Sequence, residues 1–272
     1  MTFHMSLKAA LVSMIALGAA SVASADQLAD VKAAGKIVTA TDMHYAPFDM
    51  LNNGTYEGMT KDLFDEVSKE IGVEPLYQDI PWTAELPGLE VKKFDIVIAP
   101  VTVTPERLDR YTFTLPIADA TVSLVKAASN TELSKPEDIK GKTVGVQQGT
   151  AQFKQLTAYG EKLGGVTVKE YGTTDEAYAD LAAGRLDAVA GSLPNLTYLV
   201  KNRPETFALF EPAQFGDPTY FAWVLRKDAD SEGFAKAIND AILKMTDDGR
   251  VKAIQEKWLG SYTELPREVP AK

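Results

Sequence analysis

Arg107 and a nearby threonine follow an apolar run in a pattern that suits the binding of a carboxylate. The segment PVTVTPERLDRYTF (100–113) comes directly after the buried-looking stretch FDIVIA. An arginine guanidinium is a planar fork of donors that matches a carboxylate, and Thr102 can add a hydroxyl to the same group. Arg107 could instead form a surface ion pair with Glu106 or Asp109, and its spacing alone does not choose between these roles.

A second anion-binding element is predicted at QQGTA (147–151). Gly149 and Thr150 end a strand pattern and begin a helical one, next to Gln147 and Ala151. Free backbone N–H groups at the start of a helix favour an anion. An ordinary helix N-cap is the alternative for Thr150, and from the pattern alone that alternative is preferred.

Aromatic and acidic residues follow two other strand patterns. DMHYAPFDM (42–50) places Asp42 and Tyr45 beyond the first strand, and IPW places Trp82 beyond the second. Rings in a cleft can sandwich an apolar body or face a cation, and Asp42 could meet a ligand amine. Core packing is the alternative for the rings, including that of Phe48, and a turn or helix cap is the alternative for Asp42.

These strand ends belong to a regular alternation of strands and helices. Short extended or apolar runs predict strands at 36–42, 74–80, 94–100, 121–127, 142–149, 166–171, 186–191 and 219–227. Helical spacing predicts helices at 61–72, 84–93, 151–164, 174–185 and 193–202, and two more that reach Leu259. This alternation is typical of mostly parallel sheets flanked by helices.

The alternation occurs twice without a flexible linker, which predicts an α/β fold of two lobes. Ligands of open α/β sheets bind beyond the carboxyl ends of the strands. Two such sheets that face each other would form a cleft between the lobes. The strand ends described above would line it, together with residues 191–195.

The first 25 residues have the pattern of a secretory signal peptide. Lys8 is their only charge, residues 9–23 are apolar, and ASA (23–25) is a typical cleavage site. The chain has no cysteine, which excludes a lipidated N-terminal cysteine. We therefore expect a free periplasmic protein cleaved after Ala25. The formal net charge of −10 argues against nucleic acid as a partner.

We expect no metal site, no cofactor and no catalytic residue. Acidic residues are scattered, and His44 lies among neutral neighbours. An enzyme would need a general acid or base in the cleft, for which Glu85, Asp42 and His44 are the candidates. The chain has two histidines, one of them within the signal peptide, and no obvious serine–histidine–aspartate or cysteine–histidine motif.

Six segments, in order, resemble those of periplasmic solute-binding proteins of polar amino-acid ABC importers, the family 3 extracellular solute-binding proteins. They are ATDMHYAPFDM, YEGMTKDLFDEVSKEIG, IPWTAELPGLEVKKFDIVIAPVTVTPERLDRYTFTLP, GKTVGVQQGTAQ, GRLDAVAG and IQEKWLG. The resemblance covers essentially all of the mature chain. It implies two α/β lobes joined by two hinge strands, with residues 26–118 and 218–272 in lobe 1 and residues 119–217 in lobe 2.

The resemblance also implies roles for individual residues. The family arginine of T-x-x-R, which binds the ligand α-carboxylate, falls on Arg107, and a family hydroxyl falls on Thr102. The G-T pair falls on Gly149 and Thr150. The remaining family positions, an acid and two aromatic residues, fall on Asp42, Tyr45 and Trp82.

Two departures from the family pattern bear on the choice of ligand. The family usually has an aspartate that grips the α-ammonium where this chain has Ser192, and a glycine or serine where it has Pro100. A buried ammonium without a carboxylate is costly. We therefore expect either that Asp42 or Glu85 takes the charge, or that the ligand is a betaine, a cyclic amino-acid derivative or a deaminated acid.

The function implied by the resemblance is capture of an amino acid or a related carboxylate and delivery to an ABC permease in the inner membrane, by a monomer. Two alternatives stay open. One is a periplasmic enzyme of the same fold, similar to cyclohexadienyl dehydratase. The other is a ligand-sensing subunit of a membrane receptor, which would use the same pocket.

Overall fold

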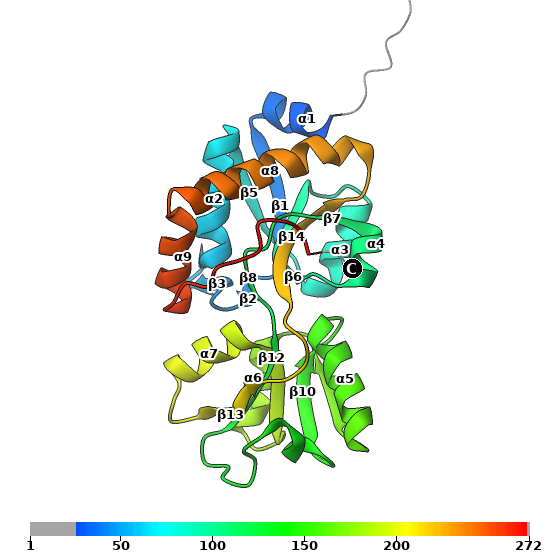
Figure 1. The fold of residues 1–272 in the computed structure, drawn as a ribbon, viewed down its shortest axis with the longest axis vertical. Helices are drawn as coiled ribbons and strands as arrows, with labels where there is room; N and C mark the ends of the chain where they lie inside the picture. Colours follow the sequence, from blue (N-terminus) through cyan, green and yellow to red (C-terminus); the bar gives the residue numbers. More distant parts are fainter. Residues whose placement is uncertain (1–25, 271–272) are drawn as a thin grey trace, which may run out of the picture.

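The computed structural model describes residues 26–270, which form two lobes that are each built around one main sheet (Figure 1). The upper lobe in Figure 1 holds the first and last parts of the chain, and the lower lobe holds the middle part. This arrangement confirms the predicted two-lobed α/β fold. The signal peptide predicted for residues 1–25 lies outside the described residues.

The main sheet of lobe 1 has the strand order β5-β1-β6-β14-β7, and β8 also pairs with β14. β5, β1 and β6 run parallel, whereas β14 is antiparallel to β6, β7 and β8. The strands are β1 (Lys36–Thr41), β5 (Glu74–Asp79), β6 (Ile96–Thr102), β7 (Tyr111–Phe113), β8 (Ala118–Asp119) and β14 (Tyr220–Arg226). A small sheet joins β2 (His44–Tyr45), β3 (Asp49–Asn52) and β4 (Thr55–Glu57).

Helices cover both faces of the lobe 1 sheet. They are α1 (Gln27–Ala34), α2 (Met59–Ile71), α3 (Trp82–Glu90), α4 (Pro105–Arg110), α8 (Ala229–Asp247) and α9 (Arg250–Leu259). On one face, α2 and α8 enclose Trp223 of β14, whose ring meets that of Phe64 at 5.1 Å between centroids. On the other face, Leu89 of α3 packs with residues of β6 and β14. The two faces are thus buried, and the strand ends stay available for a site.

Lobe 2 repeats the plan with the strand order β11-β10-β12-β9-β13. β11, β10 and β12 run parallel, and β9 is antiparallel to both of its neighbours. The strands are β9 (Val122–Ala127), β10 (Thr143–Gln147), β11 (Thr167–Tyr171), β12 (Ala188–Ser192) and β13 (Phe207–Gln214). The helices are α5 (Ala151–Leu163), α6 (Thr174–Ala182) and α7 (Leu193–Asn202), with a 3-10 turn at Pro136–Ile139.

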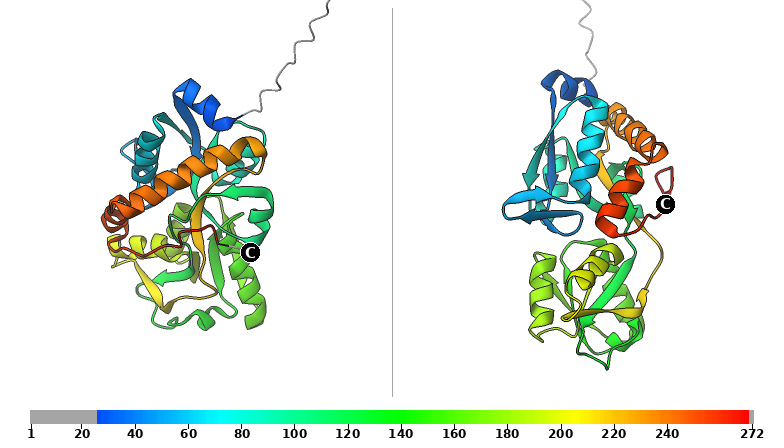
Figure 2. Two further views of the ribbon diagram at one scale, coloured as in Figure 1. Left: turned by 45° about the horizontal axis from the view of Figure 1, so that its top comes forward. Right: turned by 90° about the vertical axis from the view of Figure 1, so that its left-hand side faces the viewer.

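Two extended segments connect the lobes, as predicted. The chain leaves lobe 1 after β8 and enters lobe 2 at β9, and it returns between β13 and β14. The two segments pair at both ends, at Asp119 with Tyr220 and at Ser123 with Gln214. Figure 2 shows them passing between the lobes in both views. Such paired strands permit hinge bending while they hold the lobes in register.

Each predicted strand and helix has a counterpart with nearby bounds. The sequence analysis missed α1, α4, β7, β8, β13 and the small β2-β3-β4 sheet. Most of these elements are shorter than two helical turns or four strand residues, so they carry too few residues to show a period.

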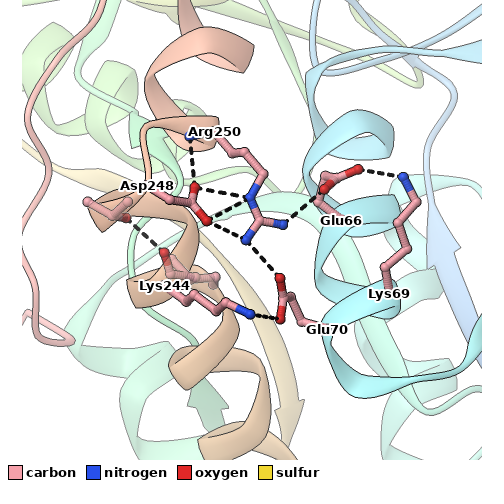
Figure 3. A network of polar contacts seen from close by, with 8 residues as sticks. Glu66, Lys69, Glu70, Lys244, Asp248 and Arg250 are labelled. Carbon is pink, nitrogen blue, oxygen red and sulfur yellow. Dashed lines mark hydrogen bonds and ion pairs between the residues drawn. The ribbon is translucent and has the colours of Figure 1, made fainter.

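A network of ion pairs fastens α9 and α8 to α2 (Figure 3). Arg250, the first residue of α9, donates to Glu66 at 2.9 Å and to Glu70 at 2.8 Å, both on α2. It also donates to Asp248 at 2.6 Å, and Lys244 of α8 donates to Glu70 at 2.6 Å. The network joins the C-terminal helices to an early part of lobe 1.

We predict that Arg250→Ala lowers the free energy of unfolding by about 1 kcal/mol, because it removes several partly exposed ion pairs together. Urea denaturation at low and at high salt measures this, and the loss should shrink at high salt because ions screen exposed charges. Arg267→Ala is the matched control, since it removes a single exposed pair with Asp247. Equal losses in the two variants would contradict the network's contribution.

Candidate functional site

A cavity lies between the lobes, at the carboxyl ends of β1, β6 and β10. Both lobes line it. The lining residues are Asp42, Tyr45, Trp82, Ala99, Pro100, Thr102, Arg107 and Phe221 from lobe 1, and Gln147, Thr150, Ala151 and Gln152 from lobe 2. Every residue of the predicted binding site except Ser192 is in this set, so the structure brings the predicted residues together.

Arg107 lies on α4 and joins the two lobes. Thr104 caps this short helix, since its hydroxyl accepts a hydrogen bond from the Arg107 amide at 3.3 Å. The guanidinium donates to the Thr102 carbonyl in lobe 1 at 3.0 Å and to the Gly149 carbonyl in lobe 2 at 3.3 Å. It also lies 5.3 Å from the centroid of the Trp82 ring. Burial lowers the pKa of Arg107 to about 10, so the side chain stays cationic at neutral pH.

The surface ion pair that was the alternative for Arg107 is formed by its neighbour instead. Glu106 pairs with Lys154 of α5, which lies in the other lobe. Because Arg107 has carbonyl groups rather than a carboxylate as its hydrogen-bond partners, its positive charge remains uncompensated by these contacts. A guanidinium in this state favours an anion within the cavity.

Helix α5 begins at the cavity wall. Thr150 is its N-cap, as the alternative interpretation held: the hydroxyl accepts from the Phe153 amide at 3.1 Å and donates to the Gln147 carbonyl at 2.8 Å. Gly149 precedes it with a φ of +70°, a conformation that favours glycine. The N–H groups of the first turn have no partner within a helix, and they therefore form an anion-favouring end at Ala151.

Asp42 also lines the cavity and is almost fully buried. One carboxylate oxygen accepts from the His44 amide at 3.1 Å, so the predicted turn-capping role is present too. The other oxygen accepts from the side chain of Gln147 in lobe 2 at 3.1 Å. Burial raises the pKa of Asp42, and the nearby His44 opposes that shift.

Aromatic rings form the remaining walls. Tyr45 and Trp82 line the cavity as predicted, whereas Phe48 is fully buried in the core of lobe 1, as its alternative held. Phe48 packs edge-on against Phe221 at 5.3 Å between centroids. Phe221 itself lines the cavity. The cavity therefore combines flat apolar walls with a few polar groups, which is typical of small-molecule sites.

Ser192 is buried behind Tyr45 rather than in the cavity wall. Its hydroxyl oxygen lies 3.0 Å from the Tyr45 hydroxyl oxygen, which is hydrogen-bond distance. Burial raises the pKa of Tyr45 to about 12, so the phenol is neutral. The contact joins the lobes through two neutral groups at the position where the family pattern has an acid.

Ala99, Phe221 and Gln152 are lining residues that the sequence analysis did not assign to the site. The side-chain amide of Gln152 lies 3.4 Å from both the Thr102 hydroxyl oxygen and the Ala120 carbonyl oxygen. The sequence could have indicated Gln152 only through its place in the first turn of the helix predicted at 151–164. Phe221 reaches the site because β14 returns beside β6, a long-range pairing that no local pattern reveals.

Further contacts around the cavity hold the lobes together. Thr174 donates to the His44 carbonyl at 3.2 Å, and the Asn195 amide donates to the Ala46 carbonyl. With the contacts of Arg107, Gln147 and Tyr45 described above, these bonds define a closed conformation. Two of the three candidate catalytic residues lie elsewhere: Glu85 is fully buried outside the lining, and His44 is exposed, 4.0 Å from Asp175. The third candidate, Asp42, lines the cavity.

Within residues 26–270 no cluster of histidine or acidic residues has the arrangement of a metal site. Over the same residues, no helix is both long and apolar enough to cross a membrane.

The comparison with known families settles what kind of protein this is. Residues 37–261 match the family described as bacterial extracellular solute-binding proteins, family 3. The chain belongs to this family. It is 32% identical to the L-cystine-binding protein TcyJ of Escherichia coli (strain K12), over 89% of this chain and 89% of that protein. The resemblance inferred from the six segments is thereby confirmed.

Solved structures agree with this assignment. An ancestral arginine-binding protein bound to arginine has a TM-score of 0.76 and 29% identity, over 82% of this chain and 98% of that chain. The ancestral amino acid-binding protein AncCDT-1, a precursor of cyclohexadienyl dehydratase, has a TM-score of 0.78 and 27% identity, over 86% and 100%. This solute-binding protein therefore has the fold of amino acid-binding proteins.

A second acid, Asp49, lies fully buried in lobe 1. The charge of Asp42 acts on Asp49, and the charge of Asp49 acts on Glu85. Asp49 accepts a hydrogen bond from the Tyr56 hydroxyl at 2.5 Å, and its other oxygen has no partner within residues 26–270. Burial raises the pKa of Asp49 from 3.8 to about 7.

We predict that the wild-type protein loses stability as the pH rises through about 7, and that Asp49→Asn weakens this loss. A carboxyl whose pKa is higher in the folded state binds its proton more tightly there, so its contribution disappears when both states ionise. The loss accumulates between about pH 4 and pH 7, where the folded state holds a proton that the unfolded state has released, and it is at most about 4 kcal/mol. Thermal unfolding between about pH 4 and pH 8 measures it. Asp240→Asn, on the exposed face of α8, is the control; a matching pH profile in both variants would contradict the prediction.

Proposed function

We propose that this protein captures an amino acid, or a closely related carboxylate, between its lobes and delivers it to an ABC permease of the inner membrane. The observation that carries the proposal is the position of Arg107, which reaches from lobe 1 to the start of α5 in lobe 2 across the cavity. A ligand carboxylate at that point would contact both lobes and favour closure.

The charges of the lining support a zwitterionic ligand. Among the lining residues, Arg107 is the basic one and Asp42 is the acidic one. A carboxylate at Arg107 and an ammonium at Asp42 would each meet the opposite charge, which avoids the cost of an unpaired buried ion. Because Glu85 lies outside the lining, Asp42 is the acid in position to take the charge that the family aspartate would take.

The walls of the cavity suit a ligand with an apolar or delocalised side chain. The rings of Tyr45, Trp82 and Phe221 supply flat surfaces for an apolar or delocalised side chain. The arginine and cystine in the names of the similar proteins are therefore the first ligands to test.

We further propose that the mature protein begins at Asp26, acts as a monomer in the periplasm, and has no enzymatic activity. We place the lobe boundaries at 118/119, within β8, and at 217/218, between β13 and β14. The dehydratase-like alternative has less support because, of its three candidate acids and bases, Glu85 and His44 lie outside the cavity lining and Asp42 alone is within it. Turnover of a cyclic carboxylate by the purified protein would support the dehydratase-like alternative. A gene neighbourhood without a permease and an ATPase would favour the sensory alternative.

We predict that Arg107→Ala weakens binding of the best ligand by about 2–5 kcal/mol, because it leaves a buried carboxylate without its charge partner. Isothermal titration calorimetry with L-arginine, L-cystine and a panel of amino acids measures the loss. Arg110→Ala is the matched control on the same helix, since Arg110 pairs with Glu90 and lies outside the cavity lining. Normal binding by the Arg107 variant would contradict the carboxylate assignment.

We also predict that Ser192→Asp improves the binding of standard α-amino acids relative to their deaminated analogues. The substitution restores an acid that the family usually uses for the ammonium, next to the Tyr45 hydroxyl. Competition calorimetry with matched pairs of amine-bearing and deaminated ligands measures the ratio. An unchanged ratio would show that Ser192 does not determine ligand choice.

A further inference from the structure

Glu85 is a buried acid that neither the core nor the cavity wall accounts for. It lies in α3, one turn after Trp82, and its side chain is fully buried. Neither carboxyl oxygen has a partner at full hydrogen-bond distance within residues 26–270, although the Asp42 backbone N–H lies close enough to oppose the rise in the pKa of Glu85. A buried carboxylate without partners is so costly that such a group normally keeps its proton.

The charges that act on Glu85 are negative. They belong to Asp42, Asp49 and Asp79, which lie at or near the ends of β1, β3 and β5. Three strands pack against α3. β6 carries no titratable residue, and β1 carries Lys36 at its first position. β14 carries Tyr220 and Arg226 at its two ends, and Arg226 pairs with Asp228. Burial first, and then these acids, raise the pKa of Glu85 well above its ordinary value.

Asp42 connects Glu85 to the cavity. It lines the cavity, and its charge is the strongest of the three that act on Glu85. A cation bound next to Asp42 would offset that negative charge and would also favour the ionised, carboxylate form of Glu85. The protonation equilibrium of Glu85, which favours the neutral form in the ligand-free protein, therefore shifts toward the carboxylate when a cationic group binds.

We propose that Glu85 is a positioning residue for the cationic group of the ligand, which holds a proton in the ligand-free protein and releases it when that group binds at Asp42. This inference rests on the proposed function. The proton leaves to solvent, and the new carboxylate adds a second negative charge behind Asp42. Glu85 thereby strengthens the site for ligands that carry an ammonium, guanidinium or imidazolium group.

The test measures proton release during binding. Calorimetry with L-arginine and L-cystine, in two buffers that differ in ionisation enthalpy, gives the number of protons released for each ligand bound. We expect release of up to about one proton in the wild-type protein, and hence affinity that rises with pH, by up to about tenfold per pH unit while the proton is released. Glu85→Gln should abolish the release and flatten this pH profile, with little loss of affinity at the acidic end.

Two further samples separate this role from a purely structural one. Glu90→Gln changes an exposed acid on the same helix, and it should leave proton release unchanged. Glu85→Leu replaces the acid with an apolar side chain and serves if the glutamine variant does not fold. Carboxyl carbon NMR of the ligand-free wild-type protein should show one glutamate that titrates well above the ordinary range and that Glu85→Gln removes.

The outcomes are distinct. Binding without proton release, release that persists in Glu85→Gln, or an ordinary titration of Glu85 would each overturn this inference and leave the proposed function intact. Failure of every amino acid in the panel to bind would overturn the proposed function, and this inference with it.

Discussion

A guanidinium held between two lobes is the interaction on which the rest of the structure depends. Arg107 donates to the Thr102 carbonyl on its own lobe and to the Gly149 carbonyl on the other. Carbonyl dipoles and the nearby Trp82 ring stabilise a cation only in part, and removal of a charge from water is costly. A ligand carboxylate would complete this environment. Closure of the lobes and capture of an anion are therefore linked through one side chain.

The fold makes this linkage possible because it places strand ends rather than strand faces at the cleft. β1 and β6 of lobe 1 and β10 of lobe 2 end at the cavity, so the residues just after them are free of sheet packing. Helices bury both faces of the lobe 1 sheet. Two paired segments connect the lobes. Closure can therefore proceed as a rigid-body rotation of one lobe against the other, with little change in either core.

Sequence reasoning found the site because the residues after a strand can be read from a local pattern. Arg107, Thr102 and Asp42 follow apolar runs, and each of them lines the cavity. The same reasoning cannot see pairing between distant segments, so it missed Phe221, which β14 brings beside β6. It also placed Ser192 with the ligand-binding residues, whereas the side chain lies behind Tyr45.

The choice between two roles for one residue also needed the three-dimensional arrangement. Thr150 caps α5 and lines the cavity, and Asp42 both caps a turn and faces the cavity, so the alternatives were not exclusive. Glu85 is the opposite case. A glutamate near the start of a helix usually faces solvent, and only the packing of α3 against the sheet shows that this one is fully buried.

The most direct measurement is a crystal structure of the protein with a bound amino acid, selected by calorimetry. The account predicts that the ligand carboxylate accepts hydrogen bonds from the Arg107 guanidinium and from the first-turn N–H groups of α5, with its ammonium against Asp42. A closed, liganded structure in which Arg107 points to solvent and the ligand lies elsewhere would contradict it.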